Sequence, residues 1–278
     1  MIIPGVIGRI DSNQGTPSTE SIEHAARRFL ADAEPLKTLA EPGCAAVVID
    51  GQQHTEDGVS CAISGNVDWL NYELADVQVK RGPQAALHQS YRRYGLDLLQ
   101  HIGGRFTAFV WDARQQKGLL ACDRFGQMPV FWTRTDDGSI CFAPTADSVM
   151  AVAGMRPEIT DQGIFNYLYF HMVPGPQSVY RDVNKLMAAE VLVFDSNRCE
   201  SRRYWHPAFR ETDDASMSEA SEEMLGLLSS SVGRLARHAD TGAFLSGGLD
   251  SSTVSGLLAR HQPKPKTYSI GFDAEGYD

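Results

Sequence analysis

The sequence predicts an α+β sandwich over about the first 205 residues, followed by the start of an α/β domain. Many short apolar runs separated by turn residues, with only a few helical patterns between them, fill residues 1–205. Such a mixture is typical of an α+β sandwich. After residue 205, an apolar run, a Ser-Gly-Gly turn and a helical pattern follow one another directly at 242–260. This order indicates a strand, a loop and a helix.

Strand and helix patterns follow in order along the chain. Short apolar runs bounded by Gly, Asp or Asn predict strands at residues 6–9, 45–50, 61–63, 106–112, 118–122, 130–133 and 140–143. Helical spacing of apolar residues predicts helices within 16–33 and at 84–95, 145–152 and 211–235. The last of these helices carries an apolar stripe, so we expect it to pack into a core. A further strand is predicted at 267–272.

Composition and charge limit the class of protein. The 278 residues, of which 42% are hydrophobic and 22% charged, have room for one large or two modest globular domains. A formal net charge of −10 argues against a nucleic-acid or anionic-membrane partner. No apolar run approaches the roughly 20 residues of a membrane span, and Met1-Ile2-Ile3-Pro4 lacks a basic segment, so we expect a cytoplasmic protein. The five cysteines form no CxxC pair, which indicates reduced, mostly buried thiols.

The stretch 241–252 has the features of an anion-binding loop. Gly247 and Gly248 carry no Cβ, so the backbone can turn tightly and bring its N–H groups close to a ligand. The following helix directs its unpaired N–H groups and positive dipole end to the same place. Asp250 could orient the loop or help to hold magnesium. An ordinary strand-to-helix turn capped by Asp and Ser is the alternative. Hydroxyl donors are supplied by Ser246, Ser251 and Ser252.

The run Ser-Gly-Gly-Leu-Asp-Ser-Ser at 246–252 resembles the pyrophosphate loop of ATP pyrophosphatases. The strand at 267–272, with acidic residues after it, is similar to the segment that comes after this loop in asparagine synthetase. The resemblance implies an α/β adenine-nucleotide hydrolase-like (PP-loop) domain that uses ATP, with magnesium at Asp250. It implies that ATP and pyrophosphate are bound by Leu245, Ser246, Gly247, Gly248, Leu249, Asp250, Ser251, Ser252, Ile270 and Gly271.

The N-terminal region resembles the glutamine amidotransferase half of asparagine synthetase. Runs that carry the resemblance lie at 103–112, 121–131, 173–180, 185–186 and 203–205. It implies an αββα sandwich of the N-terminal-nucleophile type. We therefore expect a glutamine amidotransferase type 2-like domain at 1–205 and the N-terminal part of an asparagine synthase domain at 206–278.

The residues that hydrolyse glutamine in that family are not matched. The mechanism needs a cysteine directly after the initiator Met, whereas this chain has Ile2, and the nearest register places Pro4 at the cysteine position. An arginine expected near Ala45 is absent, Ser-Gly-Asn at 64–66 replaces Asn-Gly-Glu, and Pro83 replaces an aspartate. We therefore expect no glutaminase activity, and we identify no catalytic residue.

The sequence predicts an asparagine synthetase-like, ATP-dependent ligase that forms amides. A small-molecule or peptide carboxylate would be activated as an acyl-adenylate and captured by ammonia or an amine. Homologues that close β-lactam or lasso-peptide rings are an alternative, as is a non-catalytic truncated fragment, because residues 206–278 are short for a doubly wound domain. In a truncated fragment of this kind we expect exposed apolar side chains at Val254, Leu257 and Leu258. An amidohydrolase using Cys44 or Cys61 has no supporting motif. The resemblance also allows a homodimer.

Overall fold

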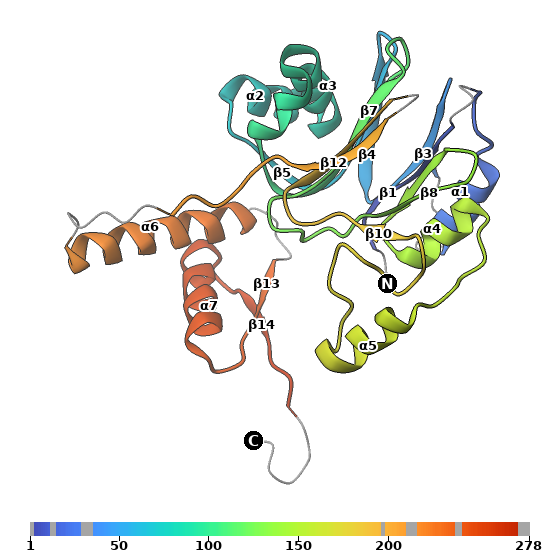
Figure 1. Ribbon diagram of the computed structural model, residues 1–278. Coiled ribbons are helices and arrows are strands. Elements are labelled where there is room, and N and C mark those ends of the chain that lie inside the picture. The colour runs from blue at the N-terminus through green and yellow to red at the C-terminus, as the bar shows by residue number, and fades with distance from the viewer. Residues whose placement is uncertain are drawn as a thin grey trace. The chain divides into compact units, whose positions relative to one another are not determined.

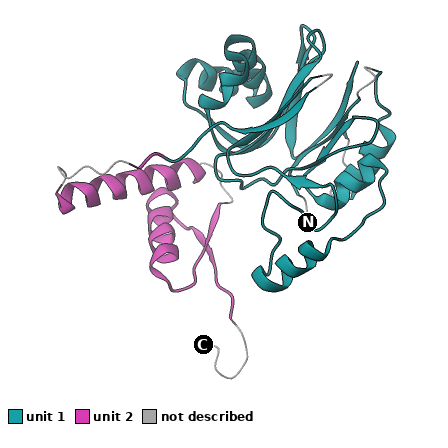
Figure 2. Ribbon diagram, viewed as in Figure 1, with its two compact units in different colours: residues 1–207 teal, residues 208–278 magenta. Residues whose placement is uncertain are grey.

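The chain forms two compact units, residues Met1–Pro207 (unit 1) and Ala208–Asp278 (unit 2) (Figure 2). The structure is a computed structural model that describes residues 3–11, 15–28, 36–195, 198–209, 216–236 and 241–271. Among these residues, no helix is both long and apolar enough to cross a membrane.

Two antiparallel sheets, each with six strands among the described residues, form the centre of unit 1. Sheet A contains, in spatial order, β10 (Asn184–Lys185), β8 (Phe131–Arg134), β9 (Ile140–Ala143), β1 (Gly5–Ile10), β3 (Cys44–Ile49) and β2 (Lys37–Glu41). Sheet B contains β12 (Cys199–Arg203), β11 (Glu190–Asp195), β7 (Lys117–Cys122), β6 (Ile102–Asp112), β5 (Val59–Trp69) and β4 (Gly51–Glu56).

Alternating side chains of these strands build three apolar cores. On β6, Phe109 lies between the sheets, where its ring centroid is 5.2 Å from that of Phe142 on β9. Its neighbours Ala108 and Val110 face the opposite core, beneath helices α2 (Tyr72–Arg81) and α3 (Pro83–Tyr94). The outer face of sheet A packs against α1 (Glu20–Arg27) and α4 (Ala146–Ala153) (Figure 1). The layers are therefore helix, sheet, sheet, helix, which confirms the predicted αββα sandwich.

Side-chain caps fix where several helices begin. Asn71 caps α2 by accepting the amide hydrogen of Glu73, and Thr145 caps α4 in the same way through Ser148. Proline at the first position of α3 leaves no amide without a partner there. A 3₁₀ helix, η1 (Gly95–Gln100), follows α3. Helix α5 (Asp161–Phe170) exposes most of its apolar side chains.

Unit 2 has four elements in its described residues: α6 (Met217–Leu235), β13 (Gly242–Phe244), α7 (Leu249–His261) and β14 (Lys266–Tyr268). Strands β13 and β14 pair in parallel, with Ala243 opposite Thr267. Leu257 and Leu258 are buried against Val232 of α6. The prediction that Leu257 and Leu258 are exposed is therefore wrong, because α6 covers that face of α7; Val254 is 41% exposed, as predicted.

Two further predictions for unit 2 need correction. Helix α6 begins at Met217, where Ser216 and Glu219 form a capping box, and residues 211–215 lie outside the described residues. Most of its apolar stripe is exposed, since Val232 is the one buried residue of α6 among the described residues. Strand β14 ends at Tyr268, so the predicted strand extends too far; Phe272 lies outside the described residues.

Candidate functional site

The glycine-rich loop leaves the carboxyl end of β13 and leads directly into α7. The amide of Leu245 donates to the backbone oxygen of Tyr268 at 2.8 Å and so continues the pairing of β13 with β14 by one residue. Because the two strands are parallel, their carboxyl ends share one edge of the sheet. This edge is where open α/β sheets bind ligands.

Two consecutive glycines shape the loop in different ways. Gly247 has φ +81°, a left-handed conformation that other residues adopt only with strain. A Cβ on Gly247 would meet nothing within 4 Å, so its backbone faces open space. Gly248 has φ −76° and ψ 163°, which any residue can adopt, and a Cβ there would lie 3.7 Å from Ser246 Oγ. The backbone conformation at position 247 therefore favours glycine. At position 248 the absence of a side chain leaves room for a ligand to approach the backbone closely.

The hydroxyl groups of Ser246 and Ser251 close the loop on itself. Ser251 Oγ accepts the backbone N–H of Ser246 at 3.2 Å and donates to the backbone oxygen of Gly248 at 3.1 Å. Since that bond uses the Ser251 proton, the 3.0 Å contact between the two hydroxyls takes its proton from Ser246. In this structure both hydroxyls hold the loop in shape, and the remaining predicted hydroxyl, Ser252, lies exposed in the first turn of α7.

Backbone N–H groups are therefore the main donors at this site. The first four N–H groups of an α-helix have no partner within the helix, and Gly248 has no side chain to cap them in α7. These groups and the helix dipole attract an anion. Leu249 and Asp250 are exposed in the same turn, so the Asp250 carboxylate is accessible to a cation. The residues present fit a phosphate group with an associated magnesium ion.

The predicted nucleotide contacts lie at the same edge of the sheet. Leu245 is half-buried, and its backbone oxygen accepts a hydrogen bond from Ser269 Oγ at 2.6 Å. Ile270, which is 76% exposed, and Gly271 follow the end of β14. The pairing of β14 with β13 thus brings Ser269 to Leu245, the residue before the loop.

The positions aligned with a glutamine-binding site have structural roles in unit 1. Ile2 lies outside the described residues, and Pro4 is half-buried just before β1. The buried Ser64 Oγ lies 2.8 Å from the backbone oxygen of Ile49 and 2.9 Å from that of Asp50, so its one proton is shared between them. Pro83 begins α3 and offers no polar side chain. Of these described residues, Pro4 and Pro83 offer no polar side chain, and the Ser64 hydroxyl is bonded to backbone oxygens.

The cysteines do not supply an alternative nucleophile. Burial raises the pKa of the Cys44 and Cys61 thiols far above the usual range. It also raises the pKa of Cys122 and Cys141 to about 12 and that of Cys199 to about 11. Because the thiolate is the nucleophilic form, an amidohydrolase that uses Cys44 or Cys61 is disfavoured.

Comparisons with known proteins match both units. The family described as "Glutamine amidotransferase domain" matches residues 81–205, and the family described as "Asparagine synthase" matches residues 223–278. The chain belongs to the asparagine synthetase family.

Similar curated proteins carry the same family name. The chain is 32% identical over 198 residues to a putative glutamine-hydrolyzing asparagine synthetase 2 from Methanocaldococcus jannaschii, covering 68% of this chain and 37% of that protein. It is 28% identical over 218 residues to a putative glutamine-hydrolyzing asparagine synthetase from Mycobacterium tuberculosis, covering 76% and 33%. The chain thus spans about a third of the length of these asparagine synthetase relatives.

A solved structure gives a weaker likeness. Glutamine phosphoribosylpyrophosphate amidotransferase from B. subtilis, complexed with ADP and GMP, superposes with a TM-score of 0.42 at 12% identity, covering 97% of this chain and 61% of that one. The assignment to the asparagine synthetase family rests on the sequence matches and on the layers of unit 1.

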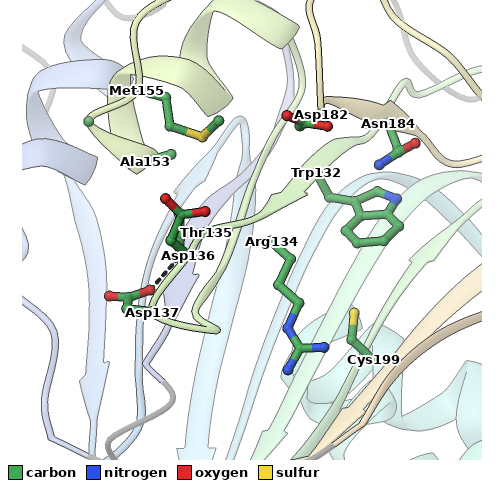
Figure 3. A pocket seen from close by; sticks show the side chains of 11 residues that line it. Trp132, Arg134, Thr135, Asp136, Asp137, Ala153, Met155, Asp182, Asn184 and Cys199 are labelled. Atoms are coloured by element: carbon green, nitrogen blue, oxygen red, sulfur yellow. Dashed lines mark hydrogen bonds between the residues drawn. The ribbon is translucent and has the colours of Figure 1, made fainter.

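Unit 1 also has a cavity that the sequence does not predict (Figure 3). Its volume is about 740 Å³, and it lies at the hairpin between β8 and β9. That hairpin adjoins the Ile10 end of β1, whereas Pro4 precedes the other end, so the cavity lies apart from the aligned glutaminase position. Its lining comes from several separate segments and includes Trp132, Arg134, Asp136, Met155, Asp182, Asn184 and Cys199. No continuous motif could have revealed it.

Proposed function

We propose that this chain contributes the nucleotide-binding loop of an ATP-dependent, amide-forming ligase. The observation that carries the proposal is the passage from β13 through an open glycine loop into the uncapped first turn of α7. Strand β14 runs parallel to β13, and the residues that follow it, Ile270 and Gly271, are proposed to contact the nucleotide. Because the chain spans about a third of its relatives, the substrates and the complete reaction belong to this proposal.

In the proposed reaction, a carboxylate oxygen attacks the α-phosphorus of ATP, and the bond from that phosphorus to pyrophosphate breaks. The N–H groups at the start of α7 would bind the departing pyrophosphate, which carries the negative charge that develops. Leu245 and Ile270 would position the nucleotide. Magnesium, held with the help of Asp250, would neutralise phosphate charge when bound. An amine then attacks the acyl carbon, AMP leaves, and the amine releases a proton.

The amine is proposed to come from free ammonia or from a second substrate. Ser64 and Pro83 have structural roles, and the buried thiols supply no nucleophile. These departures also favour the second candidate, a homologue in which an amine of the substrate itself closes a β-lactam or lasso-peptide ring. The two candidates share the loop and differ only in the source of the amine.

The role of the loop can be tested by comparing two ligands on one variant. Pyrophosphate without magnesium and magnesium–ATP are titrated calorimetrically into the parent chain and into Asp250→Asn. We expect the substitution to weaken magnesium–ATP and to leave pyrophosphate unchanged or tighter, because a negative charge is removed beside an anion. Glu223→Gln, on the exposed surface of α6, is the matched control. Absence of binding by the parent, or equal affinities for both ligands in all three proteins, would contradict the proposal.

A further inference from the structure

Three side chains of unit 1 that no motif connects converge beside the edge of sheet B. His54 and Glu56 are two residues apart on β4, so they project from the same face of this edge strand. His88 comes from α3, which contacts β4. One ligand atom from each residue, a ring nitrogen or a carboxylate oxygen, lies within 4.8 Å of the other two.

The individual distances suit ligands of one ion. His54 Nε2 is 3.1 Å from Glu56 Oε2, and His88 Nδ1 is 3.8 Å from the same oxygen. Ligands bound at 2.0–2.2 Å around a tetrahedral ion lie about 3.3–3.6 Å apart. The two distances bracket that range, and 3.8 Å is too long for a hydrogen bond.

The hydrogen bonds of His88 leave a buried lone pair directed at the cluster. His88 Nε2 lies 3.1 Å from the backbone oxygen of Glu56. A carbonyl can only accept, so Nε2 carries the proton and Nδ1 of the neutral ring carries the lone pair. A metal-binding histidine is commonly fixed in this way, through a bond from its other nitrogen to a backbone carbonyl. The side chain is only 9% exposed, so water has little access to Nδ1.

We propose that His54, Glu56 and His88 bind a divalent transition-metal ion of the zinc class. Two imidazoles and one carboxylate form a donor set that zinc uses in sites with an open fourth position. Glu56 is 49% exposed, so solvent reaches the carboxylate. The ion would tie the edge strand β4 to α3. Binding through His54 Nε2 requires the neutral ring of His54 to carry its proton at Nδ1.

Arg81 is the competing cation at this site. Its guanidinium Nη2 lies 3.6 Å from Glu56 Oε2, and the side chain is 56% exposed. A bound metal would compete with this guanidinium for the same carboxylate. Removing the Arg81 charge should therefore tighten metal binding, an effect opposite in sign to the loss of a ligand. Two unit charges about 4 Å apart in water repel each other by about 1 kcal/mol, so the repulsion of a divalent ion is about 2 kcal/mol, which corresponds to about a 30-fold change in affinity.

The test titrates zinc chloride alone into the whole chain, in competition with a chromophoric chelator. We expect one site per chain in the parent. Loss of a group that only hydrogen-bonds to a metal ligand typically lowers metal affinity 10–100-fold. Because His54→Gln and Glu56→Gln remove ligands themselves, each should weaken zinc binding about 100-fold or more. Arg81→Gln should tighten it by up to about 30-fold. The controls are His24→Gln, on the exposed surface of α1, and Cys199→Ser; both should bind as the parent does.

Two further measurements separate a ligand role from a structural one. Zinc at 100 times its dissociation constant should raise the parent Tm by roughly 5–10 °C and leave the Tm of Glu56→Gln nearly unchanged. Cobalt should bind without a thiolate-to-metal charge-transfer band. The proposal is overturned if the parent binds no zinc at micromolar concentration, if His54→Gln and Glu56→Gln bind as the parent does, or if Cys199→Ser abolishes binding.

Discussion

The substitution Gly248→Ala tests whether the loop of unit 2 binds pyrophosphate through its backbone. The φ and ψ of Gly248, −76° and 163°, are open to alanine. The new methyl group would lie 3.7 Å from Ser246 Oγ, an ordinary contact. Alanine is a poorer N-cap than glycine but restricts the unfolded chain, so the free energy of unfolding should change by no more than about 1 kcal/mol.

Binding should change far more than stability. The methyl group would stand where the anion approaches the N–H groups of Leu249 and Asp250. Hydrogen bonds to charged acceptors contribute about 1.5–3 kcal/mol each. Loss of two such bonds would therefore weaken pyrophosphate binding by about 150-fold or more. Calorimetric titration of pyrophosphate into parent and variant measures this ratio, and circular dichroism checks that the fold is kept.

Two neighbouring glycines provide the controls. Gly256 lies on the exposed side of α7 with open space around it, so Gly256→Ala should leave binding unchanged and stabilise the helix by about 0.5–1 kcal/mol. Gly247→Ala should instead destabilise unit 2 by about 1–2 kcal/mol, because its φ of +81° is left-handed. If folded Gly248→Ala binds pyrophosphate as tightly as the parent, the loop is an ordinary strand-to-helix turn and the ligase proposal loses its main support.

Three more predictions concern hydrolysis, acid stability and the core of unit 2. Incubation with glutamine should release no glutamate above the buffer control, because the Ser64 hydroxyl is bonded to the backbone and Pro83 has no polar side chain; release in proportion to protein concentration would refute this. Hydrogen bonds from Thr135 and Ser139 and the positive charge of Arg9 lower the pKa of Asp137 to about 2. This depressed pKa stabilises the fold above about pH 4, and the stabilisation is lost as the pH falls toward 2. Because Asp137 is exposed, its contribution to the free energy of unfolding is at most about 1 kcal/mol. Asp137→Asn should flatten acid unfolding between pH 4 and 2, and an unchanged profile would contradict the assignment. Leu258→Ala should lower the stability of unit 2 by about 2–5 kcal/mol, measured by hydrogen exchange of α7 amides, whereas similar protection in both proteins would show that this core contributes little.

The strands that the sequence predicts and those it does not differ in their place in the sheets. All seven strands predicted for unit 1 are interior strands: β1, β3, β5, β6, β7, β8 and β9. The edge strands β2, β4, β10 and β12 are not predicted. An edge strand is covered less completely, so β12 is nearly all exposed and carries no apolar run. Interior strands that pack on both faces read as nearly continuous apolar runs, as β3 does.

Other misses have different causes. Strand β11 is interior and carries an apolar run at 191–194, so its pattern was readable from the sequence. Helix α5 is recognisable by its Thr160 cap, but its aromatic residues are spread around the helix and most are exposed. The sequence also places Leu257 and Leu258 in solvent, since it does not reveal that α6 lies across α7. Burial of a helix face depends on the neighbouring element, which a local pattern cannot supply.

The two sites differ in how far local sequence can reveal them. The loop of unit 2 is one continuous run whose donors are backbone N–H groups, so its strand, glycines and helix could all be read from 242–261. The sequence could not show that Ser246 and Ser251 bond to each other, because those bonds depend on the turn at Gly247. The cluster of His54, Glu56 and His88 gives no such signal, since β4 is a polar edge strand and α3 begins 27 residues after Glu56. Pyrophosphate binding should therefore tolerate side-chain changes that keep the backbone shape and leave the N–H groups accessible, whereas magnesium–ATP binding should also depend on Asp250. The metal site should depend on the identity of each of its three side chains.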